Sequence, residues 1–186
     1  MKRIRLRLIS KTFTLICVLL LYVPGLFSQT SIKIDNFELS NLHRIDNGIF
    51  RSEQPDKLDF VNLEKFGITE VLNLRRWHSD EKEAKKTNLI LLHVPMRAEK
   101  IKDVNVIQAL KIIKNRKGNI LIHCKHGSDR TGLIIAMYRI VFQSYTKEQA
   151  IKEMTEGGFG FHKVFSNIID YIQQVNVEEI NQQIID

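Results

Sequence analysis

The sequence is short of cysteine, with Cys17 and Cys124 the two examples in a chain of 186 residues. It also has no acidic residue before position 28, no internal repeat, no low-complexity tract and no change of composition that would divide it. Two cysteines cannot build the disulfide framework of a small secreted protein. The length suits a single globular domain, since domains usually have about 100–200 residues.

The positive charge of the chain is concentrated at its N-terminus. There are 28 Lys and Arg against 21 Asp and Glu, a formal charge of +7, and five of the basic residues lie before position 28. The remainder is close to neutral. It shows no basic stripe interleaved with aromatic side chains, which is the pattern expected of a nucleic-acid-binding surface. We therefore predict no nucleic-acid partner.

The first 28 residues have the layout of a secretory signal peptide. A basic stretch at 1–11 precedes an apolar stretch at 13–23, and the small residue Ser28 stands before Gln29. The alternative is an uncleaved membrane anchor, but the apolar run is shorter than the roughly 20 residues that a span needs. We expect export to the periplasm or the medium, with cleavage near Ser28 and Cys124 as the one thiol of the mature protein. Residues 29–47 are then an N-terminal arm, and 48–186 the domain.

From Gly48 onward, short apolar strands alternate with helical patterns. This alternation predicts an α/β domain with a central, mainly parallel sheet flanked by helices. Asp103 is expected to cap the helix that it begins, the charged helix at 79–88 to be a solvated face, and Gly157–Gly160 to form a turn. The expected strands are 49–51, 69–74, 89–94 and 120–123, and the expected helices are 56–66, 79–88, 103–116, an apolar one after Arg130, one after a Thr146–Gln149 capping box, and 161–175.

One loop carries the features of an anion site. His-Cys-Lys-His-Gly-Ser-Asp-Arg-Thr-Gly, at positions 123–132, joins a predicted strand to a predicted helix. The carboxyl end of a parallel strand and the N-terminus of a helix both favour anion binding. Gly127 removes a side chain where the backbone must curl around the ligand. We expect the anion to be bound by the loop residues Lys125, His126, Gly127, Ser128 and Arg130.

Cys124 and Arg130 lie at the two ends of this loop. A helix N-terminus and a nearby cation lower the pKa of a thiol, and the thiolate is the nucleophile. The planar guanidinium of Arg130 matches two oxygens of a phosphoryl group and can stabilise charge in the transition state. The hydroxyl of Thr131 can hydrogen-bond the thiolate and help it to leave. These residues predict covalent catalysis of phosphoryl transfer.

The pattern His-Cys-x5-Arg-Thr-Gly resembles the signature of the cysteine-based protein tyrosine and dual-specificity phosphatases. The resemblance extends over roughly 48–175 and includes Arg51-Ser52-Glu53-Gln54-Pro55 and Leu72-Asn73-Leu74-Arg75. It implies a single-domain dual-specificity-phosphatase-like fold. It also implies a two-step reaction without metal or other cofactor, in which Cys124 takes the phosphoryl group and water then releases it. Phosphorylated proteins are the implied substrates.

The general acid departs from the common pattern of this family. Relatives carry an Asp on a loop roughly 25–35 residues before the cysteine, but the matching residues 95–99 include no Asp. Glu99 and Asp103 are the nearest acids. Asp129 is the preferred candidate, because Cys-x-x-Gly-x-Asp-Arg resembles the loops of myotubularin-type lipid phosphatases and of some secreted bacterial phosphatases of broad specificity. Repulsion from a bound phosphate would favour the protonated form that an acid needs. The alternative is that Asp129 only pairs with a nearby donor.

Several expectations concern partners. His93 and His162 have no metal-ligand spacing with other residues, so we predict no metal. The basic Lys125 and His126 favour a lipid or inositol phosphate as an alternative substrate class. A further alternative is a non-enzymatic phosphate-binding module, although an intact Cys124 and Arg130 disfavour it. We expect a monomer that meets a membrane only through an uncleaved N-terminal segment.

Overall fold

The computed structural model describes residues 31–35 and 38–185, and the predicted signal peptide lies outside this part of the chain. Strands and helices alternate through most of it, as expected. The strands are β1 (Ile32–Lys33), β2 (His43–Asp46), β3 (Ile49–Ser52), β4 (Ile68–Arg75), β5 (Ile90–Met96) and β6 (Asn119–His123). The helices are α1 (Lys57–Phe66), α2 (Asp103–Asn115), α3 (Asp129–Gln143), α4 (Lys147–Glu156), α5 (Ser166–Gln174) and α6 (Val177–Ile185), with a 3₁₀ turn at Lys163–Phe165.

The strands form one six-stranded sheet in the order β1-β2-β3-β6-β4-β5. The pairs β3–β6, β6–β4 and β4–β5 are parallel, while β1 and β2 join the edge as antiparallel strands. The prediction of a central, mainly parallel sheet flanked by helices is therefore confirmed. The carboxyl ends of β3, β4, β5 and β6 meet at one edge, which is where open α/β sheets bind ligands.

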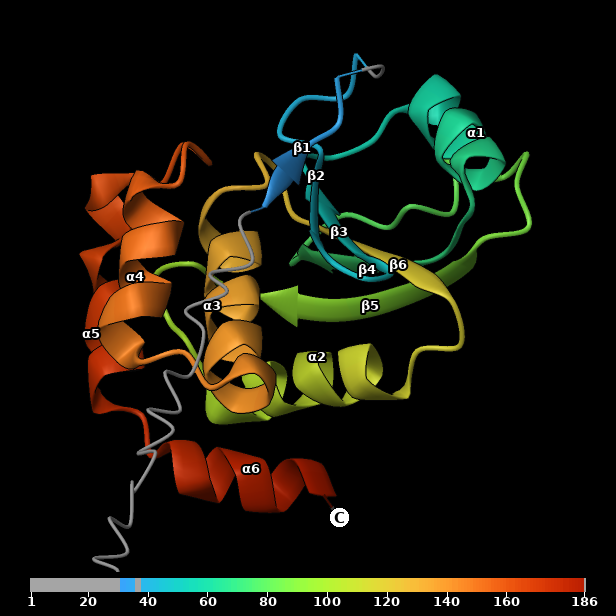
Figure 1. Cartoon of the computed structure of the whole chain (residues 1–186). Coiled ribbons are helices and arrows are strands. Elements are labelled where there is room, and N and C mark those ends of the chain that lie inside the picture. The colour runs from blue at the N-terminus through green and yellow to red at the C-terminus, as the bar shows by residue number, and fades with distance from the viewer. Residues whose placement is uncertain (1–30, 36–37, 186) are drawn as a thin grey trace, which may run out of the picture.

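Helices cover both faces of the sheet, with α1 on one face and α2 to α6 on the other (Figure 1). Side chains of β6 alternate between the two cores, because successive residues of a strand point to opposite faces. Leu121 packs on the α1 side with Phe60 and Leu63, while Ile120 and Ile122 belong to the larger core. Helix α3 is buried along most of its length, as its apolar composition predicts. It holds the loop that precedes it against the sheet.

Three helix termini have regular caps, one of which the sequence predicts. Asp56 and Asp59 form a capping box at the start of α1, and Gly67, with φ of 100°, ends that helix in the left-handed conformation. Thr146 and Gln149 form the predicted box at the start of α4. Asp103 does not cap α2, because the helix begins at this residue, and its N-cap Lys102 makes no side-chain capping bond. That part of the prediction was wrong.

The prediction of a charged helix at 79–88 is also wrong, since this segment forms a series of turns. Its residue Asp80 is 4% exposed and points inward, and Ala84 and Leu89 belong to the smaller core. The backbone closes turns from Ala84 N–H to Asp80 O and from Thr87 N–H to Ala84 O. The segment is therefore neither helical nor solvated throughout, because Asp80 and Ala84 are buried.

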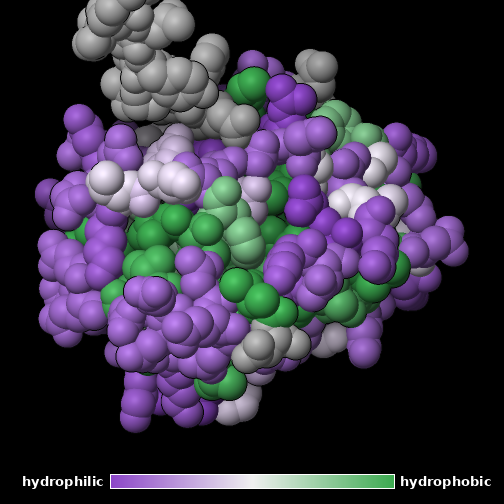
Figure 2. Space-filling view, turned by 60° about the horizontal axis from the view of Figure 1, so that its bottom comes forward, coloured by the Kyte–Doolittle hydropathy of each residue, from purple (hydrophilic) through white to green (hydrophobic). Residues whose placement is uncertain are grey.

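The predicted final helix at 161–175 is shorter than expected, because α5 begins at Ser166 after the 3₁₀ turn. Helix α6 follows it and was not predicted. Ile180 and Ile184 of α6 are buried in the larger core, and the helix packs on α2. Figure 2, which brings the α6 end of the molecule forward, shows hydrophobic side chains gathered in the middle of this face, within a polar margin.

The described part of the N-terminal arm takes part in the sheet through β1 and β2. Leu39 and Leu42 are buried in the smaller core, and Ile45 in the larger one. Within 31–35 and 38–185, no helix has the length and apolar character needed to span a membrane.

Candidate active site

The 124–130 loop joins the end of β6 to the start of α3, as predicted (Figure 1). Gly127 has φ of 69°, a conformation that disfavours residues with a Cβ atom. A Cβ at this position would lie 2.4 Å from the carbonyl oxygen of Ser52. A glycine is therefore needed at position 127, because the backbone conformation disfavours a Cβ atom and because the end of β3 lies close by.

The thiol of Cys124 lies at the base of the loop, and the residue is 1% exposed. Burial alone would raise the pKa of Cys124, yet the pKa is lowered from its ordinary value. The positive charge of Arg130 opposes the effect of burial, together with hydrogen bonds from the hydroxyl and amide of Thr131 and the amide of His126. The loop therefore favours the thiolate, which is the reactive form.

One buried polar atom of the loop lacks a hydrogen-bond partner among the described residues, namely Nε of Arg130. Buried donors are rarely left unpaired in native proteins, so such atoms indicate a missing ligand. A phosphoryl group seated in the loop would supply oxygen acceptors for Arg130, and the thiolate would accept from Thr131.

The buried side chain of Arg51 supports the backbone of the loop. It is 1% exposed, and its Nη2 donates to the carbonyl oxygen of Gly127 at 2.5 Å. Its guanidinium stacks on the ring of Phe159, 3.8 Å from the centroid. Burial lowers the pKa of Arg51 to about 10, so the group stays charged at neutral pH. These contacts are those of a residue that holds the loop.

His123 connects the loop to the buried carboxylate of Asp80. Its Nδ1 lies 3.2 Å from the carbonyl oxygen of Cys124, and its Nε2 lies 2.8 Å from Oδ2 of Asp80. Asp80 also accepts from Gln54 at 2.9 Å, and Gln54 accepts from Arg75 at 3.1 Å. Burial would raise the pKa of Asp80, but the hydrogen bond and charge of His123 lower it. This chain of contacts fixes the backbone position of Cys124.

The carboxylate of Asp129, the preferred acid, is paired. The residue is 5% exposed, and Oδ1 accepts from the backbone N–H of His162 at 2.9 Å. Nδ1 of the same His162 lies 3.1 Å from Oδ1 and 3.0 Å from Oδ2. Both oxygens therefore have partners, which is the alternative that the sequence left open beside an acid role.

The other two acid candidates are engaged as well. Glu99 is exposed and paired with Arg97 at 2.7 Å. The pKa of Glu99 is lowered, first by a hydrogen bond from its own backbone amide and then by Arg97. Asp103 accepts from the Tyr171 hydroxyl at 2.8 Å, and burial followed by this bond raises the pKa of Tyr171.

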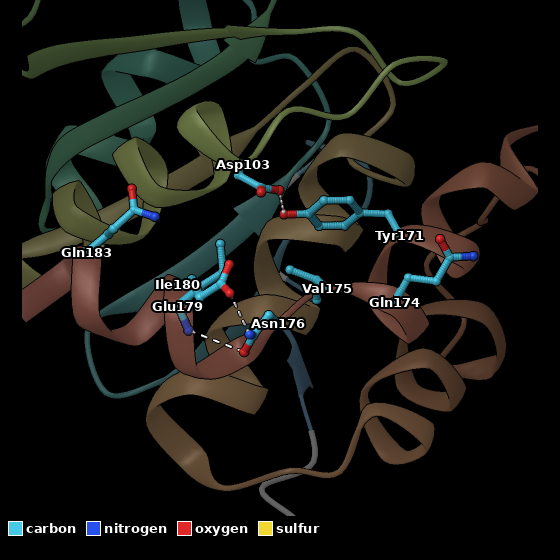
Figure 3. A pocket seen from close by; sticks show the side chains of 8 residues that line it. All are labelled: Asp103, Tyr171, Gln174, Val175, Asn176, Glu179, Ile180 and Gln183. Carbon is cyan, nitrogen blue, oxygen red and sulfur yellow. Dashed lines mark hydrogen bonds between the residues drawn. The ribbon is translucent and has the colours of Figure 1, made fainter.

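Asp103 and Tyr171 line a pocket of about 240 Å³ between α2, α5 and α6 (Figure 3). Figure 3 shows the Tyr171 hydroxyl pointing at the Asp103 carboxylate, with Asn176 and Glu179 on the other side of the pocket. The residues that line it include none from the 124–130 loop. The structure therefore does not bring Asp103 into contact with the nucleophile.

The remaining loop residues form its rim. Lys125 and His126 are exposed, whereas Ser128 is 4% exposed and donates to the carbonyl oxygen of His126 at 3.3 Å. Asn41, with φ of 59°, donates to the carbonyl oxygens of His126 at 3.1 Å and Phe159 at 3.0 Å. It ties the 157–160 turn and the arm to the loop, a contact that the sequence did not predict.

Among the described residues, one group of metal-ligating side chains has its ligand atoms within 4.8 Å of one another, namely His126, Asp129 and His162. The oxygens of Asp129 and Nδ1 of His162 already bond each other, so a metal ion would have to displace this pair. The expectation of a metal-free reaction stays a prediction.

The sequence missed three residues of the site, Asn41, Asp80 and His162. Asp80 stands in a charged stretch where no local pattern marks it as the residue that turns inward. His162 lies two residues after the glycine-rich turn at 157–160, which was expected to be a plain turn. Its place near that turn is the local signal for it.

A loop between a parallel strand and a buried helix, with a cysteine of lowered pKa at its base and an arginine at its end, defines a cysteine-based phosphatase fold. The chain belongs to the tyrosine phosphatase family, whose sequence model matches residues 36–184. It is 31% identical over 140 residues to the dual specificity protein phosphatase TpbA of Pseudomonas aeruginosa, a match covering 74% of this chain and 64% of TpbA. The chain thus spans just under two thirds of the length of that relative.

Solved structures agree with the family assignment. The crystal structure of a cysteine-to-serine variant of TpbA in complex with pTyr has a TM-score of 0.76 at 27% identity, covering 86% of this chain and 98% of that one. The core catalytic domain of the PP-IP phosphatase Siw14 from S. cerevisiae has a TM-score of 0.69 at 25% identity, covering 78% of this chain and 91% of that one.

A further relative by sequence is the inositol diphosphatase DSP4 of Arabidopsis thaliana. It is 26% identical over 166 residues, a match covering 70% of this chain and 83% of DSP4.

Proposed function

We propose that the protein hydrolyses phosphomonoesters through a phosphocysteine at Cys124, as a protein tyrosine or dual-specificity phosphatase. The observation that carries the proposal is the buried thiol, whose pKa is lowered by Arg130 and by the hydroxyl of Thr131, together with the unpartnered Nε of Arg130. The thiolate attacks phosphorus, Arg130 binds two equatorial oxygens, and the alcohol leaves. Water then cleaves the S–P bond, and Thr131 donates to the sulfur as it leaves as thiolate.

The direct test is hydrolysis of para-nitrophenyl phosphate in excess EDTA. The wild type should turn over, and Cys124→Ser should lose turnover by about 10⁴-fold or more while still binding inorganic phosphate. Substantial activity of Cys124→Ser would contradict the nucleophile. A wild type that binds phosphate but hydrolyses no phosphate ester would instead support a non-enzymatic phosphate-binding module.

We propose phosphorylated protein as the first substrate class, and inositol phosphates or phosphoinositides as the second. TpbA, the relative crystallised with pTyr, favours the first class. The exposed cations Lys125 and His126 at the rim favour a substrate with more than one phosphate, and the names of DSP4 and Siw14 point the same way. Comparing kcat/KM for a phosphotyrosine peptide and an inositol diphosphate decides between them. Preference for the diphosphate, lost in Lys125→Ala, would establish the second class.

We also propose that the protein acts outside the cytoplasm as a monomer, after removal of residues 1–28. The basic and apolar stretches of the N-terminus support export. N-terminal sequencing of the protein from fractionated cells tests the idea. A mature chain beginning near Gln29 supports it, and an intact Met1 in the membrane fraction would establish the anchor instead.

A further inference from the structure

The proton donor for the leaving group is the open part of the proposed reaction. A carboxylic acid donates from an oxygen that faces the substrate, and each predicted acid already has hydrogen-bond partners. Glu99 pairs with Arg97, Asp103 accepts from Tyr171, and Asp129 accepts from His162. These contacts point to a proton donor other than the three carboxylates.

The contacts between Asp129 and His162 define which nitrogen carries a proton. An ionised carboxylate only accepts hydrogen bonds. Nδ1 of His162, 3.0 Å from Oδ2 of Asp129, is therefore the donor, and Nε2 is the nitrogen that can exchange a proton with a substrate. A buried carboxylate holding Nδ1 of a histidine is the arrangement that orients an acid–base imidazole in hydrolases. Imidazole exchanges protons near neutral pH, as a general acid should.

The position of His162 suits a group acting at the mouth of the loop. The ring of His162 has its centroid 5.3 Å from that of His126, which belongs to the loop. A Cβ built on Gly160 would lie 3.4 Å from Oγ of Ser128, so the backbone two residues before His162 passes close to the loop. The side chain of His162 is 46% exposed, whereas that of Asp129 is 7% exposed. The imidazole can reach a substrate, and the carboxylate beneath it is fixed.

We propose that His162 is the catalytic proton donor and that Asp129 is the residue that positions it. As the bond from Cys124 sulfur to phosphorus forms, the P–O bond of the ester breaks, and its electron pair stays on the leaving oxygen. That oxygen takes the proton from Nε2 of the His162 imidazolium. In the second step, neutral Nε2 accepts a proton from the attacking water while the S–P bond breaks and the thiolate leaves. The inference rests on the proposed phosphatase activity and adds to it a residue from outside the loop.

The test compares leaving groups in wild type, His162→Gln, Asp129→Asn and the double variant. Para-nitrophenolate leaves without much need of a proton, whereas phenolate needs one. His162→Gln keeps the backbone bond to Asp129, so the segment stays attached while the imidazole is lost. Lys163→Gln, a substitution at the exposed neighbouring residue, is the matched control.

In His162→Gln we expect kcat/KM, which reports the step in which the leaving group departs, to stay within about threefold of wild type for para-nitrophenyl phosphate and to fall about 10²-fold for phenyl phosphate. Asp129→Asn should show the same selectivity, and the double variant should lose no more than His162→Gln, because the two residues act as one unit. Lys163→Gln should match wild type with both substrates. Added imidazole should restore part of the phenyl phosphate activity of His162→Ala, which a merely structural role would not allow.

Other outcomes overturn the inference. A selective loss in Asp129→Asn with none in His162→Gln would make Asp129 itself the acid. Equal losses with both substrates and no rescue by imidazole would reduce the pair to a structural contact. If His162→Gln behaves as wild type, the inference fails while the phosphatase activity stands. A wild type inert towards every aryl phosphate would contradict the proposed function, and the inference with it.

Discussion

The base and the lip of the 124–130 loop are built in different ways. At the base, Cys124, His123 and Arg51 are almost fully buried, and their partners are fixed backbone and carboxylate atoms. At the lip, His126 and His162 are exposed, and their rings lie with centroids 5.3 Å apart although the residues come from separate segments. The comparison teaches that attack on phosphorus relies on a rigid scaffold, whereas the proton transfer proposed above relies on an exposed side chain. Substitutions at the base should therefore cause larger and less selective losses.

Arg130→Met should have the largest effect among substitutions of the groups around the thiol. We expect kcat/KM for aryl phosphates to fall about 10³-fold, because the guanidinium both binds the phosphoryl oxygens and stabilises transition-state charge. Arg130→Lys should recover little, since an ammonium group lacks the planar fork. Steady-state hydrolysis measures both, and near-wild-type activity of Arg130→Lys would contradict the role of the fork.

The same Arg130→Met variant should raise the pKa of Cys124. Burial favours the neutral thiol, and Arg130 is the largest cause that lowers the pKa. The thiolate fraction then declines at a higher pH than in wild type, so alkylation by iodoacetamide near pH 6 should be slower in the variant. Equal alkylation rates at that pH would show that Arg130 does not stabilise the thiolate.

Gly127→Ala should have the next largest effect. Its φ of 69° strains any residue with a Cβ, by about 1–3 kcal/mol, and the new methyl group would collide with Ser52 O at 2.4 Å. Displacement of the loop should lower kcat/KM by about 10²-fold. Gly158→Ala is the matched control, because φ is 82° there but nothing lies within 4 Å of the added Cβ. If both variants lose activity equally, the collision with β3 is not the cause.

Asp80→Asn should have a moderate effect, because it removes a charged partner from buried His123. We expect the free energy of unfolding in urea to fall by about 1–3 kcal/mol and kcat by about tenfold. Glu81→Gln, at the exposed next residue, should change stability by less than about 0.5 kcal/mol. An Asp80→Asn variant as stable and as active as Glu81→Gln would mean that the chain from Arg75 to His123 does not support the loop.

Glu99→Gln should have the smallest effect, because the Glu99 side chain is exposed. Its partner Arg97 is exposed as well, and exposed ion pairs contribute little to stability. We expect less than a threefold change in kcat with either phenyl or para-nitrophenyl phosphate. A loss of about 10²-fold confined to phenyl phosphate would transfer the role of general acid to Glu99.

The sequence was informative where neighbours in the chain are also neighbours in space. Cys124, Gly127 and Arg130 fall within seven positions, and the strand before them and the helix after them have clear apolar patterns. The contacts of Asp80 and His162 instead span 43 and 33 positions, respectively. No local pattern encodes such pairs. The charges around Asp80 even favoured an incorrect helix, because composition does not reveal which one of many charged residues turns inward.

The most direct test of the central claim is to trap the intermediate. Wild-type protein mixed with excess para-nitrophenyl phosphate should be quenched in acid within the first turnovers, digested and examined by mass spectrometry. We predict one phosphoryl group on the peptide that contains Cys124, and none on that peptide in Cys124→Ser. A phosphoryl group on His126, or steady turnover with no phosphorylated peptide at all, would contradict the account.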